Sequence, residues 1–166
     1  MGTNSQTFLI GIHIDSGEPG VPEGERAITY RGVVKAEHCD HMGHMNVMWY
    51  VGKFDEASWQ MFAAMGLTRS RMQKEKRGVA GVEQRIEYKR ELRAGDVITV
   101  RSAVNEVKEK VVRLTHVMTN DDTGEVAAIM HLVAVYFDTE ARKSLPLPAE
   151  LRERASRMIT EAKSPK

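Results

Sequence analysis

The sequence lacks the features that mark several classes of protein. Its 166 residues include a single cysteine, Cys39, so no disulfide framework forms within the chain. Lys and Arg number 24 against 23 Asp and Glu, and the net charge of +1 shows none of the basic excess typical of nucleic-acid-binding proteins. The longest apolar stretch, Val126 to Val135, contains His131 and is too short to span a bilayer. These absences predict a cytoplasmic protein without a nucleic-acid or membrane partner.

The composition that remains is that of one globular domain. Hydrophobic residues make up 42% of the chain and charged residues 28%, which is not the composition of a disordered protein. No Lys or Arg precedes Arg26 and no long apolar core follows the first residue, so we expect no signal peptide. Five Gly and Pro residues between positions 17 and 24 predict an irregular segment. We therefore expect an N-terminal arm over 1–26, one domain over 27–145, and a C-terminal helix and tail over 146–166.

The pattern of apolar residues predicts an α+β fold. The clearest helix runs from Val47 to Gly66, because its apolar residues recur at three- and four-residue spacings and Asn46 is a suitable N-cap. Further helices are predicted within 68–78 and over 149–161, and strands over 27–38, 79–92, 97–104, 111–118 and 125–137. One strand, one long helix and an antiparallel meander predict a single sheet that covers the helix. The exposed edges of such a sheet predict an oligomer.

Two strands carry finer expectations. In the strand 79–92, the apolar residues Ala80, Val82, Ile86, Tyr88 and Leu92 are expected to share one face. The segment Glu125 to Phe137 is nearly all apolar, which is typical of a central strand covered on both faces.

The segment from His38 to Asn46 carries the residues suited to chemistry. Three of the six histidines lie in it, directly before the predicted helix. The first turn of a helix leaves N–H groups unpaired and carries a partial positive charge, so it can hold a developing oxyanion. Asp40 supplies a carboxylate that can act as base or nucleophile. Gly43 allows close backbone approach, and His44 is placed to hydrogen-bond Asp40 or a substrate carbonyl.

The pattern Asp40-x-x-Gly43-His44-x-Asn46, followed by Tyr50 on a long helix and by strands entered through Arg93-Ala94-Gly95-Asp96, resembles the hotdog-fold thioesterases. The greatest similarity is to the branch of the 4-hydroxybenzoyl-CoA thioesterases. The resemblance implies a hotdog fold and an acyl-CoA thioesterase that releases a free carboxylic acid and coenzyme A. It implies Asp40 as base or nucleophile with His44 and Asn46 as further catalytic residues, although an Asn in this place is also a helix cap.

The resemblance also implies how the substrate is held. Backbone N–H groups between Gly43 and Val47 would form the oxyanion hole, and the substrate-binding residues would be Met42, Gly43, Met45, Val47 and Tyr50. Coenzyme A would enter as part of the substrate, with no separate cofactor and no metal. The protein would be a homodimer or a homotetramer. The acyl group stays open, and a short, an aromatic or a quaternary-ammonium group such as betainyl are all compatible with the sequence.

Two departures from related patterns matter. The acyl-carrier-protein thioesterases of plants read Asp-x-Asn-x-His-x-Asn here, and this chain has Met42 in place of the first Asn, which predicts a simpler polar site. Another branch carries its catalytic Glu on the long helix, so Glu56 is an alternative catalytic residue.

Other interpretations of the same residues remain. His38, His41 and His44 with Cys39 are zinc-ligand types, but Gly43 and Asn46 favour a turn, and no second pair of ligands follows. The basic run Arg69, Arg71, Lys74, Lys76 and Arg77 is either a solvated face or a contact for the phosphates of coenzyme A. Trp49, Tyr50 and Trp59 either line an acyl pocket or pack in the core. A hotdog-type enoyl-CoA hydratase and a non-catalytic module that binds an acyl ligand are the alternative functions.

Overall fold

The structure is a computed structural model that describes residues 26–159. The predicted arm up to residue 25 lies outside the described residues. The helix predicted over 149–161 ends earlier, at Arg157, and positions 160–161 lie outside the described residues. The helices are η1 (Ala36–His38, a 3-10 turn), α1 (Val47–Ala64), α2 (Arg69–Glu75) and α3 (Ala149–Arg157). The strands are β1 (Ala27–Val33), β2 (Arg77–Tyr88), β3 (Val97–Val107), β4 (Val111–Asn120), β5 (Val126–Asp138) and β6 (Lys143–Ser144).

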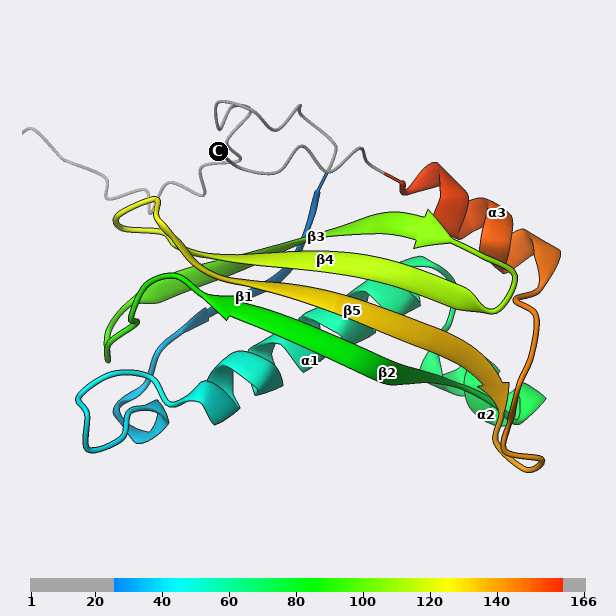
Figure 1. Ribbon diagram of the computed structural model, residues 1–166, viewed down its shortest axis with the longest axis horizontal. Helices are drawn as coiled ribbons and strands as arrows, with labels where there is room; N and C mark the ends of the chain where they lie inside the picture. Colours follow the sequence, from blue (N-terminus) through cyan, green and yellow to red (C-terminus); the bar gives the residue numbers. More distant parts are fainter. Residues whose placement is uncertain (1–25, 160–166) are drawn as a thin grey trace, which may run out of the picture.

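The strands form one antiparallel sheet that curves over the long helix (Figure 1). The strand order is β1-β3-β4-β5-β2, and the short β6 pairs with the end of β5. Both β1 and β2 are edge strands, since each pairs with a single neighbour among the described residues. The predicted α+β arrangement of one sheet and one long helix is confirmed.

The predicted helix at 47–66 is confirmed, and so is its cap. The Asn46 side chain accepts a hydrogen bond from the Met48 N–H at 3.0 Å, which satisfies one of the free donors of the first turn. The helix buries Phe54, Ala57 and Met61 against the sheet. Val47 and Val51 were expected on the same buried face, but they are 56% and 38% exposed. The apolar face of α1 therefore extends beyond the core at its N-terminal end.

The predicted alternation along β2 is wrong in its first half. Opposite residues of an antiparallel pair share a face, and Ile86 lies opposite Met130 whereas Ala80 lies opposite Val135. Met130 and Val135 are an odd number of positions apart on β5, so Ala80 and Ile86 point to opposite faces. The cause is an irregularity between Gly81 and Glu83, where one extra residue enters β2.

The apolar segment 125–137 is an interior strand, as predicted, with β4 and β2 on its two sides. Coverage on both faces is not observed, because burial alternates along β5. The even-numbered positions from Ala128 to Tyr136 are buried under α1, and the residues between them are half-buried.

A buried hydrogen-bond chain joins α1 to the sheet. His116 on β4 is fully buried, with its Nε2 at 3.2 Å from Ser58 Oγ of α1 and its Nδ1 at 2.6 Å from Ser102 Oγ of β3. Thr29 Oγ1 of β1 lies 2.5 Å from the same Ser102 hydroxyl. Burial lowers the pKa of His116 to about 3, so the ring is neutral and fixed in the core. This Ser–His arrangement is inaccessible to a substrate, and its role is structural.

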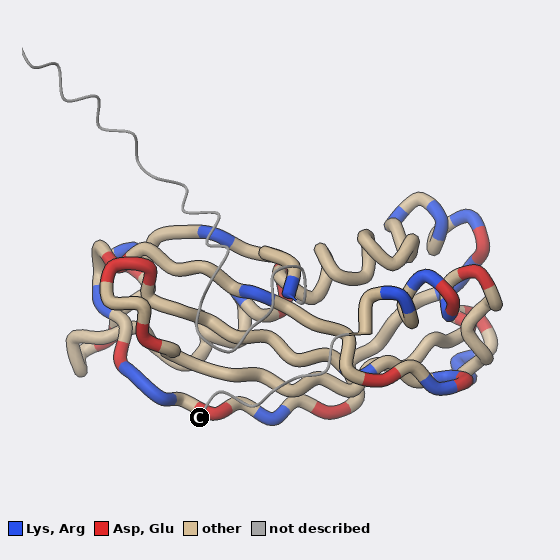
Figure 2. Tube along the Cα trace, turned by 90° about the horizontal axis from the view of Figure 1, so that it is seen from above, with Lys and Arg blue, Asp and Glu red and all other residues tan. Residues whose placement is uncertain are grey.

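Acidic and basic residues are interspersed along the chain (Figure 2).

The predicted short helix α2 is confirmed, and most of the positive charges in its basic run are paired with acidic side chains. Arg71 pairs with Glu75 and Glu150, Lys76 with Glu140, and Arg77 with Asp138. None of the helices within 26–159 has the length and hydropathy that crossing a bilayer requires.

Candidate active site

The loop between η1 and α1 is a tight turn that carries Asp40. The Asp40 N–H donates to the His44 carbonyl at 3.2 Å and the Gly43 N–H donates to the Asp40 carbonyl at 2.9 Å. Gly43 has a φ of +80°, which a residue with a side chain adopts only at a cost. The turn predicted from Gly43 is therefore the feature that reverses the chain before the helix.

Three further contacts fix the turn to the body of the protein. The Met45 N–H donates to the Leu92 carbonyl at 2.6 Å, and the Asn46 N–H donates to the His38 carbonyl at 2.9 Å. The Met45 side chain is buried in the core. The turn is thus held on one side by η1 and on the other by the segment after β2.

The Asp40 carboxylate is held by both of its oxygens. Oδ1 accepts from the Met42 N–H at 2.9 Å and Oδ2 accepts from the Asn46 side-chain amide at 2.7 Å. The hydrogen bond from Asn46, followed by the one from Met42, holds the pKa of Asp40 below its usual value. The carboxylate is therefore ionised at neutral pH, half-buried, and fixed next to the start of α1.

Asn46 connects the carboxylate to the helix. Its amide nitrogen contacts Asp40 while its amide oxygen caps the helix through the Met48 N–H. One side chain therefore orients the carboxylate and completes the first turn of α1.

The His44 side chain makes no hydrogen bond to the Asp40 carboxylate. Its Nε2 lies 3.8 Å from Glu91 Oε1, and its Nδ1 lies 3.5 Å from the Met45 carbonyl. Its ring is half-buried, and His44 lines a pocket.

The pocket has a volume of about 360 Å³ and lies between the turn, the start of α1 and the end of β2. It is lined by His44, Met45, Val47, Tyr50, Tyr88, Lys89, Arg90 and Glu91. The Tyr50 hydroxyl donates to the Arg90 carbonyl at 3.2 Å, and the Tyr50 ring meets the Tyr88 ring edge-on at 5.2 Å. Burial raises the pKa of Tyr50 to about 12, so this hydroxyl stays protonated.

The predicted substrate-binding residues divide into two groups. Met45, Val47 and Tyr50 line the pocket, whereas Met42 and Gly43 do not and are exposed on the outside of the turn. The wall formed by 88–91 was missed, because nothing local in the sequence of a strand end indicates that it folds against a helix start.

The predicted oxyanion donors are mostly occupied. The N–H groups of Gly43, Met45 and Asn46 each donate to a carbonyl, as described above. Val47 is the first residue of α1, and its N–H makes no hydrogen bond within 26–159. The His44 N–H likewise makes no hydrogen bond within 26–159, and both residues line the pocket, so these two N–H groups are the remaining candidate donors for a substrate oxygen.

The remaining candidates occupy other places. His38 is buried, accepts from the Lys35 N–H at 3.0 Å and packs on the Trp49 ring at 4.1 Å. The Cys39 thiol contacts the Lys35 carbonyl at 3.9 Å. Glu56 is exposed on α1 and does not line the pocket. Across residues 26–159, no three His, Cys, Asp or Glu side chains gather as metal ligands would.

Comparison with known proteins gives consistent matches. The family described as the thioesterase-like superfamily matches residues 34–155. The long-chain acyl-CoA thioesterase FadM of Escherichia coli is 28% identical over 130 residues, which cover 76% of this chain and 95% of that protein.

Solved structures share the fold. A Staphylococcus aureus protein in complex with CoA superposes with a TM-score of 0.77 at 20% identity, over 85% of this chain and 91% of that one. A gentisyl-coenzyme A thioesterase superposes with a TM-score of 0.67 at 25% identity, over 76% of this chain and 98% of that one. The expected hotdog fold is confirmed.

Proposed function

This chain belongs to the thioesterase-like superfamily and is a thioester hydrolase, and from that premise we propose that it cleaves acyl-CoA with Asp40 as the reacting carboxylate. The observation that supports this role is the Asp40 carboxylate itself, which Met42 and Asn46 hold in place beside the start of α1. Asp40 does not line the pocket of about 360 Å³, but His44, Met45 and Val47, which follow it in the chain, do.

The reaction needs a nucleophile, an acceptor for its proton and support for the oxyanion. As a base, Asp40 takes a proton from a water molecule while the water oxygen attacks the thioester carbon. The carbonyl oxygen becomes an oxyanion, which the Val47 N–H and the positive end of α1 stabilise. Collapse of this intermediate expels the coenzyme A thiolate and leaves the carboxylic acid, and the proton held by Asp40 passes to the thiolate, which restores the carboxylate.

A nucleophilic route uses the same groups. Asp40 attacks the thioester carbon, the thiolate departs, and the mixed anhydride is then hydrolysed by water. Both routes need an ionised carboxylate, and the lowered pKa of Asp40 provides one at neutral pH. Neither route needs a cofactor beyond the coenzyme A of the substrate.

The predicted test is the substitution Asp40→Asn, which keeps the shape of the side chain and removes its charge. We expect the rate of thiol release from a panel of acyl-CoA substrates to fall about 10²–10⁴-fold. Asp122→Asn is the matched control, because Asp122 lies in the exposed turn between β4 and β5, and we expect wild-type rates from it.

Full activity of Asp40→Asn would exclude the carboxylate from the reaction. No thiol release by the wild-type protein from any substrate would favour a binding module instead, and loss of enone absorbance from crotonyl-CoA would favour a hydratase.

The proposed partner is a second copy of this chain. β2 is an edge strand of 12 residues, and its Val82 and Tyr88 side chains are 59% and 49% exposed. A long unpaired strand edge is a template for another strand. We propose that β2 pairs with β2 of a second protomer, which gives a homodimer or a dimer unit of a homotetramer.

A further inference from the structure

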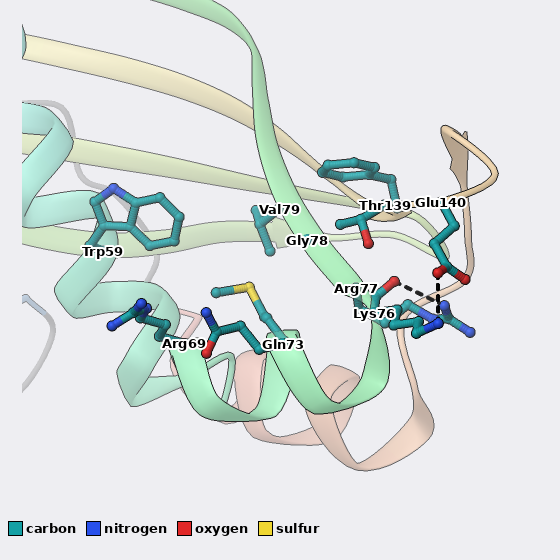
Figure 3. A pocket seen from close by; sticks show the side chains of 11 residues that line it. Trp59, Arg69, Gln73, Lys76, Arg77, Gly78, Val79, Thr139 and Glu140 are labelled. Atoms are coloured by element: carbon teal, nitrogen blue, oxygen red, sulfur yellow. Dashed lines mark hydrogen bonds and ion pairs between the residues drawn. The ribbon is translucent and has the colours of Figure 1, made fainter.

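A second pocket, at the start of β2, shows cations that are paired with carboxylates. It has a volume of about 370 Å³, and its lining includes Lys76 and Arg77 (Figure 3). Lys76 Nζ lies 2.6 Å from Glu140 Oε1, and Arg77 Nη1 lies 2.7 Å from Asp138 Oδ2. None of the charged residues that line this pocket is buried.

Lys53 on α1 is a cation of a different kind, because it is buried without a counterion. Only 4% of the residue is exposed, and it makes no ion pair among residues 26–159. Its Nζ donates to the hydroxyl of Tyr30 on β1 at 3.0 Å and lies 5.1 Å from the centre of the Tyr30 ring. Burial of an unpaired charge costs free energy of folding, so we looked for a group on which this charge acts.

The charge of Lys53 acts on His38, whose ring is also buried. Burial of the ring, followed by the positive charge of Lys53, lowers the pKa of His38 below 6.5. The other charged groups that face the ring belong to its own turn, where Glu37 raises the pKa and Lys35 lowers it. From α1, the Trp49 ring packs on the imidazole at 4.1 Å. The His38 ring is therefore mainly neutral at neutral pH.

The turn before Asp40 depends on a neutral His38 ring. The Nδ1 atom of His38 accepts a hydrogen bond from the Lys35 N–H at 3.0 Å, which closes η1. A protonated imidazole carries an N–H at both nitrogens and accepts nothing, so protonation would turn two donors towards each other. The His38 carbonyl accepts from the Asn46 N–H at 2.9 Å, and the Asn46 side chain donates to Asp40. The imidazole is thus connected to the carboxylate through η1 and Asn46.

We propose that His38 and Lys53 are positioning residues for the proposed reaction, in which the neutral His38 ring holds the turn that carries Asp40 and the charge of Lys53 keeps that ring neutral. This inference rests on the proposed function. Neither residue lines the pocket at the start of α1, so both act through Asn46 and Asp40.

The two positioning residues set how far the pH can fall before the site loses its geometry. The value of kcat should fall when His38 becomes protonated, whereas KM should change less, because the pocket is lined by other residues. Asp40 stays ionised through this titration, since its pKa is held below its ordinary value. Protonation of Asp40 is therefore not the cause of the fall.

The first test is Lys53→Met, which removes the charge and keeps the length of the side chain. We expect the pKa of the His38 ring, measured by NMR, to rise by about one unit, and the midpoint of kcat against pH to rise with it. Lys143→Met is the matched control, because Lys143 is exposed on β6, and Lys53→Arg keeps the charge. Both should keep the wild-type midpoint. A midpoint that stays in place in Lys53→Met would overturn the inference.

The second test is His38→Asn, in which the side-chain oxygen can accept the Lys35 N–H and cannot be protonated at these pH values. One pH unit below the pKa of His38, the wild type should keep about a tenth of its kcat, and the variant should be about tenfold more active. Circular dichroism at each pH shows that both proteins are folded. An equal loss of kcat in the variant and the wild type, or no loss in the wild type, would contradict the role of His38.

A readout without catalysis separates this inference from the proposed function. Full activity of Asp40→Asn would mean that the proposed function fails. The positioning is then tested by the NMR signals of the Asn46 side-chain amide, which should shift with the titration of His38 in the wild type and stay constant in His38→Asn. Wild-type signals that do not follow this titration would show that the ring does not hold the turn.

Discussion

At the scale of single residues, Asn46 is the side chain on which the candidate site depends. It donates to Asp40 Oδ2 at 2.7 Å and accepts from the Met48 N–H at 3.0 Å. Its loss therefore affects the acidity of the carboxylate and the stability of the helix, and the two effects can be separated.

We predict that Asn46→Ser raises the pKa of Asp40 while the protein keeps its stability. Serine caps a helix about as well as asparagine, but it lacks the amide that donates to Asp40. The hydrogen bond from Asn46 is the largest cause of the lowered pKa of Asp40, so its removal moves that pKa up towards the ordinary value. Carbon-13 NMR titration of the Asp40 carboxyl measures this shift.

Asn46→Ala is the comparison that isolates the cap. It should raise the pKa in the same direction and also lower the free energy of unfolding by about 0.5–2 kcal/mol. An Asp40 pKa that does not move in either variant would show that Asn46 does not tune the carboxylate.

Local contacts of this kind were predictable from the sequence, and contacts across the fold were not. The cap by Asn46 and the turn at Gly43 involve residues within a few positions of each other, so residue type and order indicate them. The pairing of His44 with Glu91 joins segments that come together only when the sheet folds over α1. The sequence suggested either Asp40 or a substrate carbonyl as the partner of the His44 side chain. A hydrogen bond to the Asp40 carboxylate is not observed, and the bond to a substrate carbonyl stays a prediction.

At the scale of secondary-structure elements, α1 packs on the sheet through apolar side chains and through the contact between Ser58 and the neutral ring of His116. Burial lowers the pKa of His116 to about 3, whereas an unfolded histidine has a pKa near 6.5. Above pH 6.5 the ring is neutral in both states and the folded protein has its full stability. As the pH falls below 6.5, the unfolded state binds a proton that the folded state excludes, so stability decreases.

We predict that the free energy of unfolding of the wild-type protein falls between pH 6.5 and 4.5. His116 contributes up to about 1.4 kcal/mol per pH unit in this window, and His38 and His131, whose pKa values are also lowered by burial, add to it. Urea unfolding at intervals of one pH unit gives the slope of the free energy of unfolding against pH.

His116→Gln should be less stable than the wild type at pH 7.5 but show a shallower slope. His41→Gln, which changes an exposed residue, should keep the wild-type slope. An equal slope in His116→Gln and wild type would contradict this assignment.

The apolar periodicity of the sequence predicts some features of the sheet and misses others. Strand positions and the long helix follow from apolar periodicity, because burial selects residue type at each position. The extra residue in β2 does not follow from it, since Gly81, Val82 and Glu83 read as an ordinary alternation. One inserted residue exchanges the two faces of the strand. In an antiparallel β2 pair with Arg77 opposite Tyr88 of the partner subunit, this exchange lets opposite residues such as Val79 and Ile86 share a face.

At the scale of the whole molecule, the proposed dimer depends on how β2 of one protomer pairs with β2 of its partner. We predict that Ala80→Cys combined with Arg85→Cys, in a Cys39→Ser background, gives a covalent dimer on mild oxidation. When the two strands overlap fully, with Arg77 opposite Tyr88 of the partner subunit, Ala80 lies directly opposite Arg85 of the partner subunit, with Cβ atoms about 4.5–5.5 Å apart. Within one chain they are five strand residues, or about 16 Å, apart, so they cannot bond to each other. Ala80→Cys with Glu87→Cys is the control, because its cysteines are diagonal neighbours about 7–8 Å apart and should link far more slowly on a non-reducing gel. Faster linkage in this control would mean a register shifted by two residues and would contradict full overlap of the two strands.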